Sequence, residues 1–204
     1  MLVSRMMHPV CTLGPGDRFA IWVSGCKRRC KKCANPELQA FDPKNEIPID
    51  VLIQVVSDFC ISKGVTGITI SGGEPFEQPE ELEKLVYGLP EQVHDILVFS
   101  GYTIEQLHEK KNPAIEKVLA RISVLVDGEY KDELNQGHPL KGSQNQRIWF
   151  LQDEVKEAYE QFIRSHEATV QQFATSDDVF AIGIHRRNFD EDLARLMKKK
   201  GLSV

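Results

Sequence analysis

Three cysteines stand close together in residues 26–33, which read CKRRCKKC, and every residue between them is a lysine or an arginine. The spacing is C-x-x-x-C-x-x-C, with Cys26, Cys30 and Cys33 as candidate metal ligands. Cysteine thiolates are the usual ligands of iron-sulfur clusters, and three of them can hold three corners of a cubane cluster. The segment therefore predicts an iron-sulfur site in which the fourth iron stays open to another ligand.

Zinc is the alternative occupant of the same loop. A structural zinc site needs four Cys or His ligands, often arranged as two separated pairs, and here the fourth would be His8, Cys11 or a distant residue. Cys60 falls on the apolar face of a predicted helix, where we expect a small buried side chain, and we expect Cys11 to be structural. Ligand counting favours the cluster over zinc.

A second motif, SGGEP at residues 71–75, follows the next predicted strand. The consecutive glycines Gly72 and Gly73 let the backbone approach a ligand closely, and Glu74 supplies a carboxylate for a cationic group such as an ammonium. A plain turn before the following helix is the alternative interpretation. Two such loops on successive strands favour a shared ligand site.

The elements that position these loops alternate along the chain. Short apolar runs predict strands at residues 18–24, 67–71, 95–100, 122–127, 147–151 and 178–184. Helical patterns occupy residues 48–63, 79–87, 104–110, 114–121, 154–166 and 189–200. This alternation predicts an α/β fold with a mostly parallel sheet, and both motifs follow strands at the carboxyl end, where such folds bind ligands.

Composition limits the remaining possibilities for this chain of 204 residues. We expect a core over residues 1–152 and a C-terminal extension over residues 153–204 packed on it. The net charge of −5 argues against nucleic-acid binding, and no apolar run is long enough to span a membrane. Five cysteines, three of them in one loop, argue against a disulfide framework and predict a cytoplasmic location.

The two loops together resemble those of the radical S-adenosylmethionine enzymes. The resemblance implies a partial (β/α) barrel and a 4Fe-4S cluster on the three loop cysteines, whose open iron chelates the amino and carboxylate groups of S-adenosyl-L-methionine. Gly72, Gly73 and Glu74 would contact the methionine amino group. One electron would then cleave this cofactor to methionine and a 5′-deoxyadenosyl radical that abstracts hydrogen, so the protein binds and orients while the cofactors do the chemistry.

A narrower resemblance covers about residues 13–150. Its matching segments are residues 14–26, 71–76, 99–103, 126–130 and 141–148. They look like the glycyl-radical activase family that serves anaerobic ribonucleoside-triphosphate reductase, which implies a glycyl radical enzyme as partner. Such activases commonly have a histidine after the third cysteine, whereas this chain has Ala34, followed by the retained Asn35.

Several polar residues near the strand ends are further candidates. Ser100 and Asp127 end the third and fourth putative parallel strands and could reach the ribose or the carboxylate of the cofactor, although ordinary turns are the alternative. Asn145, Gln146 and Arg147 precede a strand and could cap the site or contact the partner. A solvated loop is the alternative for these three residues.

The five basic residues between the cysteines have two interpretations. They are Lys27, Arg28, Arg29, Lys31 and Lys32. They are either solvated charges or a positive patch that offsets the thiolates and steers an acidic electron donor, such as a flavodoxin or ferredoxin. For the whole chain, the alternatives to the activase are a radical enzyme acting on another peptide or small molecule, and a non-enzymatic zinc or iron-sulfur module.

Overall fold

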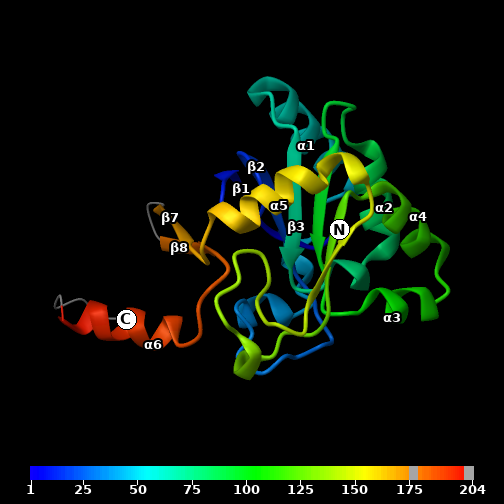
Figure 1. Cartoon of the computed structure of the whole chain (residues 1–204). Helices are drawn as coiled ribbons and strands as arrows, with labels where there is room; N and C mark the ends of the chain where they lie inside the picture. The colour runs from blue at the N-terminus through cyan, green and yellow to red at the C-terminus, as the bar shows by residue number, and fades with distance from the viewer. Residues whose placement is uncertain (175–178, 200–204) are drawn as a thin grey trace.

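A computed structural model describes residues 1–174 and 179–199 and contains a central six-stranded sheet (Figure 1). Its strands, in spatial as well as chain order, are β1 (Val3–Val10), β2 (Arg18–Val23), β3 (Gly67–Gly72), β4 (Asp95–Phe99), β5 (Val124–Asp127) and β6 (Arg147–Phe150). The strands from β2 to β5 run parallel, and β1 and β6 are antiparallel edges. The predicted α/β fold with a mostly parallel sheet is confirmed, whereas the partial barrel stays a prediction.

The sequence analysis did not predict β1. Its residues mix charged, polar and apolar types, and only Val3 and Val10 at its ends are buried, so the alternation that identifies a half-buried strand is missing. Pairing with the fully buried β2 holds this segment in the sheet, which is a tertiary effect.

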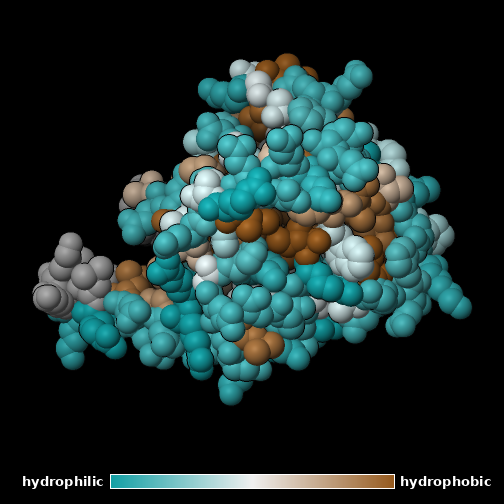
Figure 2. All heavy atoms as spheres, in the orientation of Figure 1, coloured by the Kyte–Doolittle hydropathy of each residue, from teal (hydrophilic) through white to brown (hydrophobic). Residues whose placement is uncertain are grey.

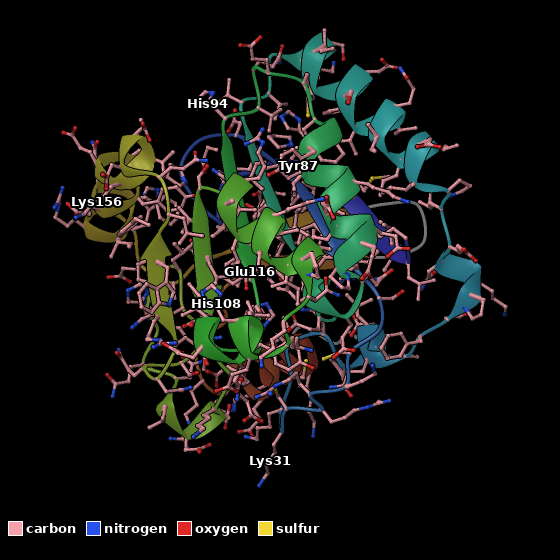
Figure 3. All side chains as sticks on the ribbon, turned by 90° about the vertical axis from the view of Figure 1, so that its right-hand side faces the viewer. Lys31, Tyr87, His94, His108, Glu116 and Lys156 are labelled. Carbon is pink, nitrogen blue, oxygen red and sulfur yellow. The ribbon has the colours of Figure 1, made fainter. Side chains whose placement is uncertain are left out.

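Helices cover the sheet on one face through the crossovers between the parallel strands. They are α1 (Ile49–Lys63), α2 (Pro79–Gly88), α3 (Ile104–Glu109) and α4 (Pro113–Arg121). His108 on α3 faces Glu116 on α4, with Nδ1 2.8 Å from the carboxylate (Figure 3). On α1, the predicted buried face is confirmed at Leu52 and at Cys60, which is fully buried, whereas Val55 is exposed. None of the helices in the described part of the chain is long and apolar enough to cross a membrane.

Alternation along the strands sends side chains to two separate cores. Ile96 and Val98 of β4 pack with α1, α2 and α4, whereas Leu97 between them packs on the opposite face with Tyr159 and Phe162. Both aromatic residues belong to α5 (Lys156–Ser165), which closes the second face. Figure 2 shows a mainly hydrophilic surface over this face, with apolar residues visible in a band across the middle.

The chain beyond α5 forms a small antiparallel hairpin and a last helix. These elements are β7 (Val170–Ala174), β8 (Val179–Gly183) and α6 (Phe189–Lys199), and α6 lies on the side of the molecule away from α2 and α4 (Figure 1). Gln171 attaches the hairpin to the end of β1 and the residue that follows it, donating to Pro9 O at 2.8 Å and accepting from the Cys11 N–H at 3.1 Å. Asp178 and Lys200, at the ends of the predicted strand and helix, lie outside the described residues. The division at residue 152 stays a prediction.

A buried ionic network ties the amino ends of the parallel strands together. Arg18, the first residue of β2, is fully buried, and its Nη1 lies 2.5 Å from Asp95 Oδ2 at the start of β4. Its Nε donates to Thr69 Oγ1 at 2.6 Å and its Nη2 donates to Ile68 O at 2.7 Å. The Tyr159 hydroxyl donates to Asp95 Oδ1 at 2.9 Å, which links α5 to the sheet. The network lies at the end of the strands opposite the predicted site.

Candidate metal centre

A cleft at the carboxyl ends of the parallel strands brings the predicted loops together. All three loop cysteines line it. The cleft also contains residues from the ends of the parallel strands: Gly72, Gly73 and Glu74 at β3, Ser100 and Gly101 after β4, and Gly128 after β5. The position at the carboxyl end is the one expected for this architecture, because each crossover loop leaves its strand on that side.

Backbone N–H groups face two of the three thiols. Burial raises the pKa of the Cys26 thiol, and the backbone N–H groups of Arg28 and Arg29 oppose this shift by stabilising the thiolate. Burial likewise raises the pKa of Cys30, opposed by the backbone N–H of Tyr130. The neighbouring loop thiolates raise both pKa values further, so the sulfurs lie near enough to interact.

The third thiol has a similar environment. The backbone N–H of Asn35 donates to Cys33 Sγ at 3.4 Å, and none of the cysteines forms a disulfide. Within residues 1–174 and 179–199, no three Cys, His, Asp or Glu side chains lie close enough together to hold one metal ion. A cubane cluster with one open iron needs three thiolate ligands, each at a different iron. Three thiols that line one cleft therefore fit the ligand number of such a cluster.

The glycines of the SGGEP loop pack directly against the chain that enters the cysteine loop (residues 26–33). The Gly73 N–H donates to Val23 O at 2.8 Å, and the Glu74 N–H donates to Gly25 O at 2.9 Å. A Cβ on Gly72 would lie 2.3 Å from Val23 O, and one on Gly73 would lie 2.5 Å from Gly25 O. The glycines thus have a packing requirement, which the sequence analysis did not foresee, in addition to the predicted approach to a ligand.

Glu74 connects the loops after β3 and β4. Its side chain is buried, with Oε1 accepting from the Phe76 N–H and the Ser100 hydroxyl, each at 3.0 Å. Its Oε2 accepts from the Gly101 N–H at 2.6 Å. Burial raises the pKa of Glu74 to about 7, against the opposing effect of these hydrogen bonds. The predicted contact of this carboxylate with a ligand ammonium stays a prediction, and its observed role is to fix the Ser100 loop at the cleft.

Asp127 is a predicted cofactor contact that does not line the cleft. Its carboxylate is buried, and Oδ2 accepts from Arg147 Nη2 at 2.6 Å and from the Ile104 N–H at 2.7 Å. Arg147 also holds Glu105, and this contact lowers the pKa of the Glu105 carboxyl to about 2. Asp127 therefore anchors the start of α3 and the start of β6, while its neighbour Gly128 lines the cleft.

Asn145 and Gln146, which precede β6, support the loop of residues 128–146 beside the cleft. Gln146 lines the cleft, and its Oε1 accepts from the Gly142 N–H at 2.8 Å while its Nε2 donates to Gly128 O at 2.8 Å. Asn145 donates from Nδ2 to Glu129 O at 2.8 Å. Both amide side chains thus hold the loop of residues 128–146 in place.

The basic residues of the cysteine loop mostly pair with neighbouring segments, which neither sequence-based interpretation described. Lys27 Nζ lies 2.7 Å from Glu77, whose side chain is only 4% exposed. Lys32 Nζ lies 3.2 Å from Asp132. Lys31 makes no side-chain hydrogen bond or ion pair among the described residues and points away from the body of the protein (Figure 3).

Two arginines complete the attachment of the loop. Arg28 lines the cleft, its guanidinium lies over the Tyr102 ring with Cζ 4.9 Å from the centroid, and its Nη2 lies 3.4 Å from Glu129. Arg29 donates to Gln39 at 3.3 Å. The spacers therefore attach the cysteine loop to the neighbouring segments that carry Gln39, Glu77, Tyr102 and Asp132.

Part of the cleft wall comes from segments that the sequence analysis did not assign to the site. Trp22 and Phe99 provide apolar surface from the sheet, and Ala181, Ile182 and Ile184 come from the hairpin and the segment after it. These apolar residues follow no motif, so no sequence signal distinguishes them from ordinary core residues.

Comparison with known proteins agrees with this geometry. The family model described as a 4Fe-4S single cluster domain matches residues 12–149, a range that contains both the cysteine loop and the SGGEP loop. The chain therefore belongs to this family of iron-sulfur proteins.

Within that class, the chain resembles activating proteins. The anaerobic ribonucleoside-triphosphate reductase-activating protein of Salmonella typhi is 32% identical over 148 residues, which cover 68% of this chain and 91% of that protein. The protein of the same name from Enterobacteria phage T4 is 28% identical over 148 residues, covering 70% and 89%. The pyruvate formate-lyase-activating enzyme of Staphylococcus aureus is 38% identical over 101 residues, covering 45% of this chain and 39% of that enzyme.

Proposed function

We propose that this chain is a radical S-adenosylmethionine enzyme that generates a glycyl radical on a partner enzyme such as an anaerobic ribonucleotide reductase. The observation that carries the proposal is the cleft, where backbone N–H groups stabilise three cysteine sulfurs next to the SGGEP loop. The printed names of the relatives support an activating role on such a partner.

In this proposal, Cys26, Cys30 and Cys33 hold the 4Fe-4S cluster. When bound, the cluster supplies the electron that cleaves S-adenosyl-L-methionine to methionine and a 5′-deoxyadenosyl radical. The chain's own residues hold negative charge on the sulfurs through backbone N–H groups, because such hydrogen bonds tune iron-sulfur centres. The apolar wall that includes Trp22 and Phe99 limits the access of water to the cleft.

The SGGEP loop would position the cofactor. Gly72, Gly73 and Glu74 would contact its amino group, and Ser100 lines the same cleft. Asp127 would act indirectly, by holding Arg147 and the start of α3. An acidic flavodoxin or ferredoxin would supply the electron, and the free thiols suit the reducing cytoplasm.

The test of the cofactor is anaerobic reconstitution with iron and sulfide. We expect about four irons per chain, following the 4Fe-4S composition, and formation of 5′-deoxyadenosine on reduction. Cys30→Ala should abolish cofactor cleavage, because it removes one of only three cysteine ligands. Cys60→Ala is the matched control, since it removes a buried thiol from α1 and should cost stability alone. A colourless protein that binds zinc, or full activity in Cys30→Ala, would overturn the assignment.

The test of the partner is electron paramagnetic resonance. Incubation of the reduced, loaded protein with an anaerobic reductase should produce a glycyl radical signal on that reductase. Cofactor cleavage without such a signal would favour a radical enzyme that acts on another peptide or small molecule.

A further inference from the structure

Two charged side chains of opposite sign line the cleft at the candidate metal centre. Among the described residues that line it, Arg28 is the only lysine or arginine, and Glu74 is the only aspartate or glutamate. A charged group of a ligand is bound favourably in such a cleft only where it meets a complementary charge or hydrogen-bonding group. One cation and one anion in the same cleft therefore suit a ligand that carries one charge of each sign.

The two charged groups flank Gly101, in the loop that follows β4. A Cβ on Gly101 would lie 3.5 Å from Arg28 Nε and 3.4 Å from Glu74 Oε2. Glycine at this position thus keeps the space between a guanidinium and a carboxylate free of a side chain. Arg28 pairs with Glu129, and it forms no ion pair with Glu74 within the described part of the chain. These two opposite charges are neighbours without being partners.

The Arg28 guanidinium retains hydrogen-bond donors that its protein contacts do not use. Its ion pair among the described residues is with Glu129, which lies 3.4 Å from Nη2 and is 42% exposed. Nε is buried and has no hydrogen-bond partner among those residues. A buried donor without an acceptor is costly, so a ligand that supplies the acceptor is favoured. The planar fork of donors suits a carboxylate, which it can bind through two parallel hydrogen bonds.

Glu74 retains an acceptor position beside the same glycine. An ionised carboxylate has about four acceptor sites, two on each oxygen. Oε1 accepts from the Phe76 N–H and from the Ser100 hydroxyl. Among the described residues, Oε2 accepts from the Gly101 N–H alone. Oε2 can therefore accept one further hydrogen bond, and a ligand ammonium suits it because the group is a cation with three donors.

We propose that Arg28 and Glu74 together form a subsite for the zwitterionic end of an α-amino acid, in which Arg28 binds the carboxylate and Glu74 binds the ammonium. An α-amino acid carries both groups on one carbon, so it meets both charges at once. The inference rests on the proposed function for the identity of the ligand, because S-adenosyl-L-methionine ends in such a group. It gives Arg28 a binding role in addition to attaching the cysteine loop.

The test uses the full-length, cluster-loaded protein in its oxidised state, so that binding is measured without cleavage of the cofactor. Isothermal titration calorimetry gives the Kd for S-adenosyl-L-methionine and for decarboxylated S-adenosylmethionine, which lacks only the carboxylate. The variants are Arg28→Gln and Arg28→Lys. Glu129→Gln is one control, since it removes the ion-pair partner of Arg28. Lys31→Gln is the other, since it removes a cation of the same loop that does not line the cleft.

We expect Arg28→Gln to bind S-adenosyl-L-methionine about 10- to 100-fold more weakly, the range for losing hydrogen bonds between charged groups. Arg28→Lys should lose less, because it keeps the charge without the planar fork. The affinity for the decarboxylated compound should stay the same in both variants. The ratio of the two affinities does not depend on the fraction of protein that holds a cluster, so the test remains valid if loading falls. Both controls should keep the wild-type ratio.

Equal losses for the two compounds in Arg28→Gln would give Arg28 a purely structural role and overturn the proposal, as would unchanged binding of both. L-Methionine separates this subsite from the proposed function. If L-methionine binds in a manner that depends on Arg28 while the reduced wild type fails to cleave the cofactor, the subsite stands and the proposed function falls. Cleavage by the wild type, together with an unchanged affinity ratio in Arg28→Gln, would support the proposed function and overturn the subsite.

Discussion

The buried network around Arg18 allows a sharp test of how this sheet is stabilised. Asp95→Asn removes the charge that faces the guanidinium while keeping the shape of the side chain. Arg18 is 0% exposed, so after the change a buried cation retains only neutral acceptors, which include Thr69 Oγ1 and Ile68 O. Leaving a buried charge without its counter-ion is strongly unfavourable because the interior cannot solvate it as water does.

The expected loss of unfolding free energy follows from these contacts. Breaking a buried pair costs about 3–5 kcal/mol. Asp95 retains 14% exposure and Arg18 keeps its neutral acceptors, so we expect the lower end, about 3 kcal/mol. Tyr159→Phe removes only the hydrogen bond to Asp95 Oδ1 and should cost about 1.5 kcal/mol. Both changes affect the same carboxylate, so the double variant should lose less than the sum.

Urea denaturation followed by circular dichroism measures these differences in unfolding free energy. If the slope of that free energy against urea concentration is unchanged, the variants still unfold from an intact folded state. The network lies at the amino ends of the strands, so iron content after reconstitution should stay at the wild-type level in Asp95→Asn. A loss below about 1 kcal/mol would refute the reasoning, because it would mean that neutral acceptors alone suffice for the buried guanidinium.

Three further predictions concern the loops around the cleft. Gly73→Ala should cost about 1–3 kcal/mol and lower iron content, because its Cβ would lie 2.5 Å from Gly25 O directly before the cysteine loop; normal iron content would contradict this. Ser100→Ala removes a hydroxyl that donates to Glu74 and accepts a backbone N–H, so urea denaturation should show a loss of about 1–2 kcal/mol. His138 accepts two backbone N–H groups at Nδ1, and burial lowers its pKa to about 4. Its folded pKa thus lies below the ordinary value of 6.5, so stability should fall as pH drops from about 6.5 to about 4. His138→Asn should flatten that part of the pH profile, and an unchanged slope would exclude His138 as its source.

Much of the fold follows from local sequence patterns. Alternation of short apolar runs with amphipathic segments predicted the mixed α/β fold and the parallel strands, because crossover helices must bury one face against a sheet. The patterns missed β1 and β7. Residue types in β1 show no regular alternation, and β7 keeps its strand only through pairing with β8. Pairing at the edge of a sheet depends on the partner strand and on the turn that leads to it. The hydrophobic periodicity of the segment itself does not indicate either of them.

Residue chemistry identified the candidate ligands but not all of their surroundings. Thiol spacing alone singled out Cys26, Cys30 and Cys33, and the cleft contains all three. Position at a strand end suggested Asp127 as a cofactor contact, yet its side chain turns to Arg147 and the start of α3. A strand end fixes where the backbone lies, whereas the side chain follows the nearest strong hydrogen-bond donors.

The sequence by itself determined the ligand types, their spacing and their placement after strands, because these properties are local to a few residues. Only the tertiary structure decided what the charges and glycines do. Lys27 and Lys32 pair with acids that lie 50 or more residues away, and Gly73 is needed where two loops touch. The last segment of the chain meets the cysteine loop across a cleft. Contacts between distant segments arise when the sheet brings strand ends together, and that geometry appears only once the hydrophobic faces are buried.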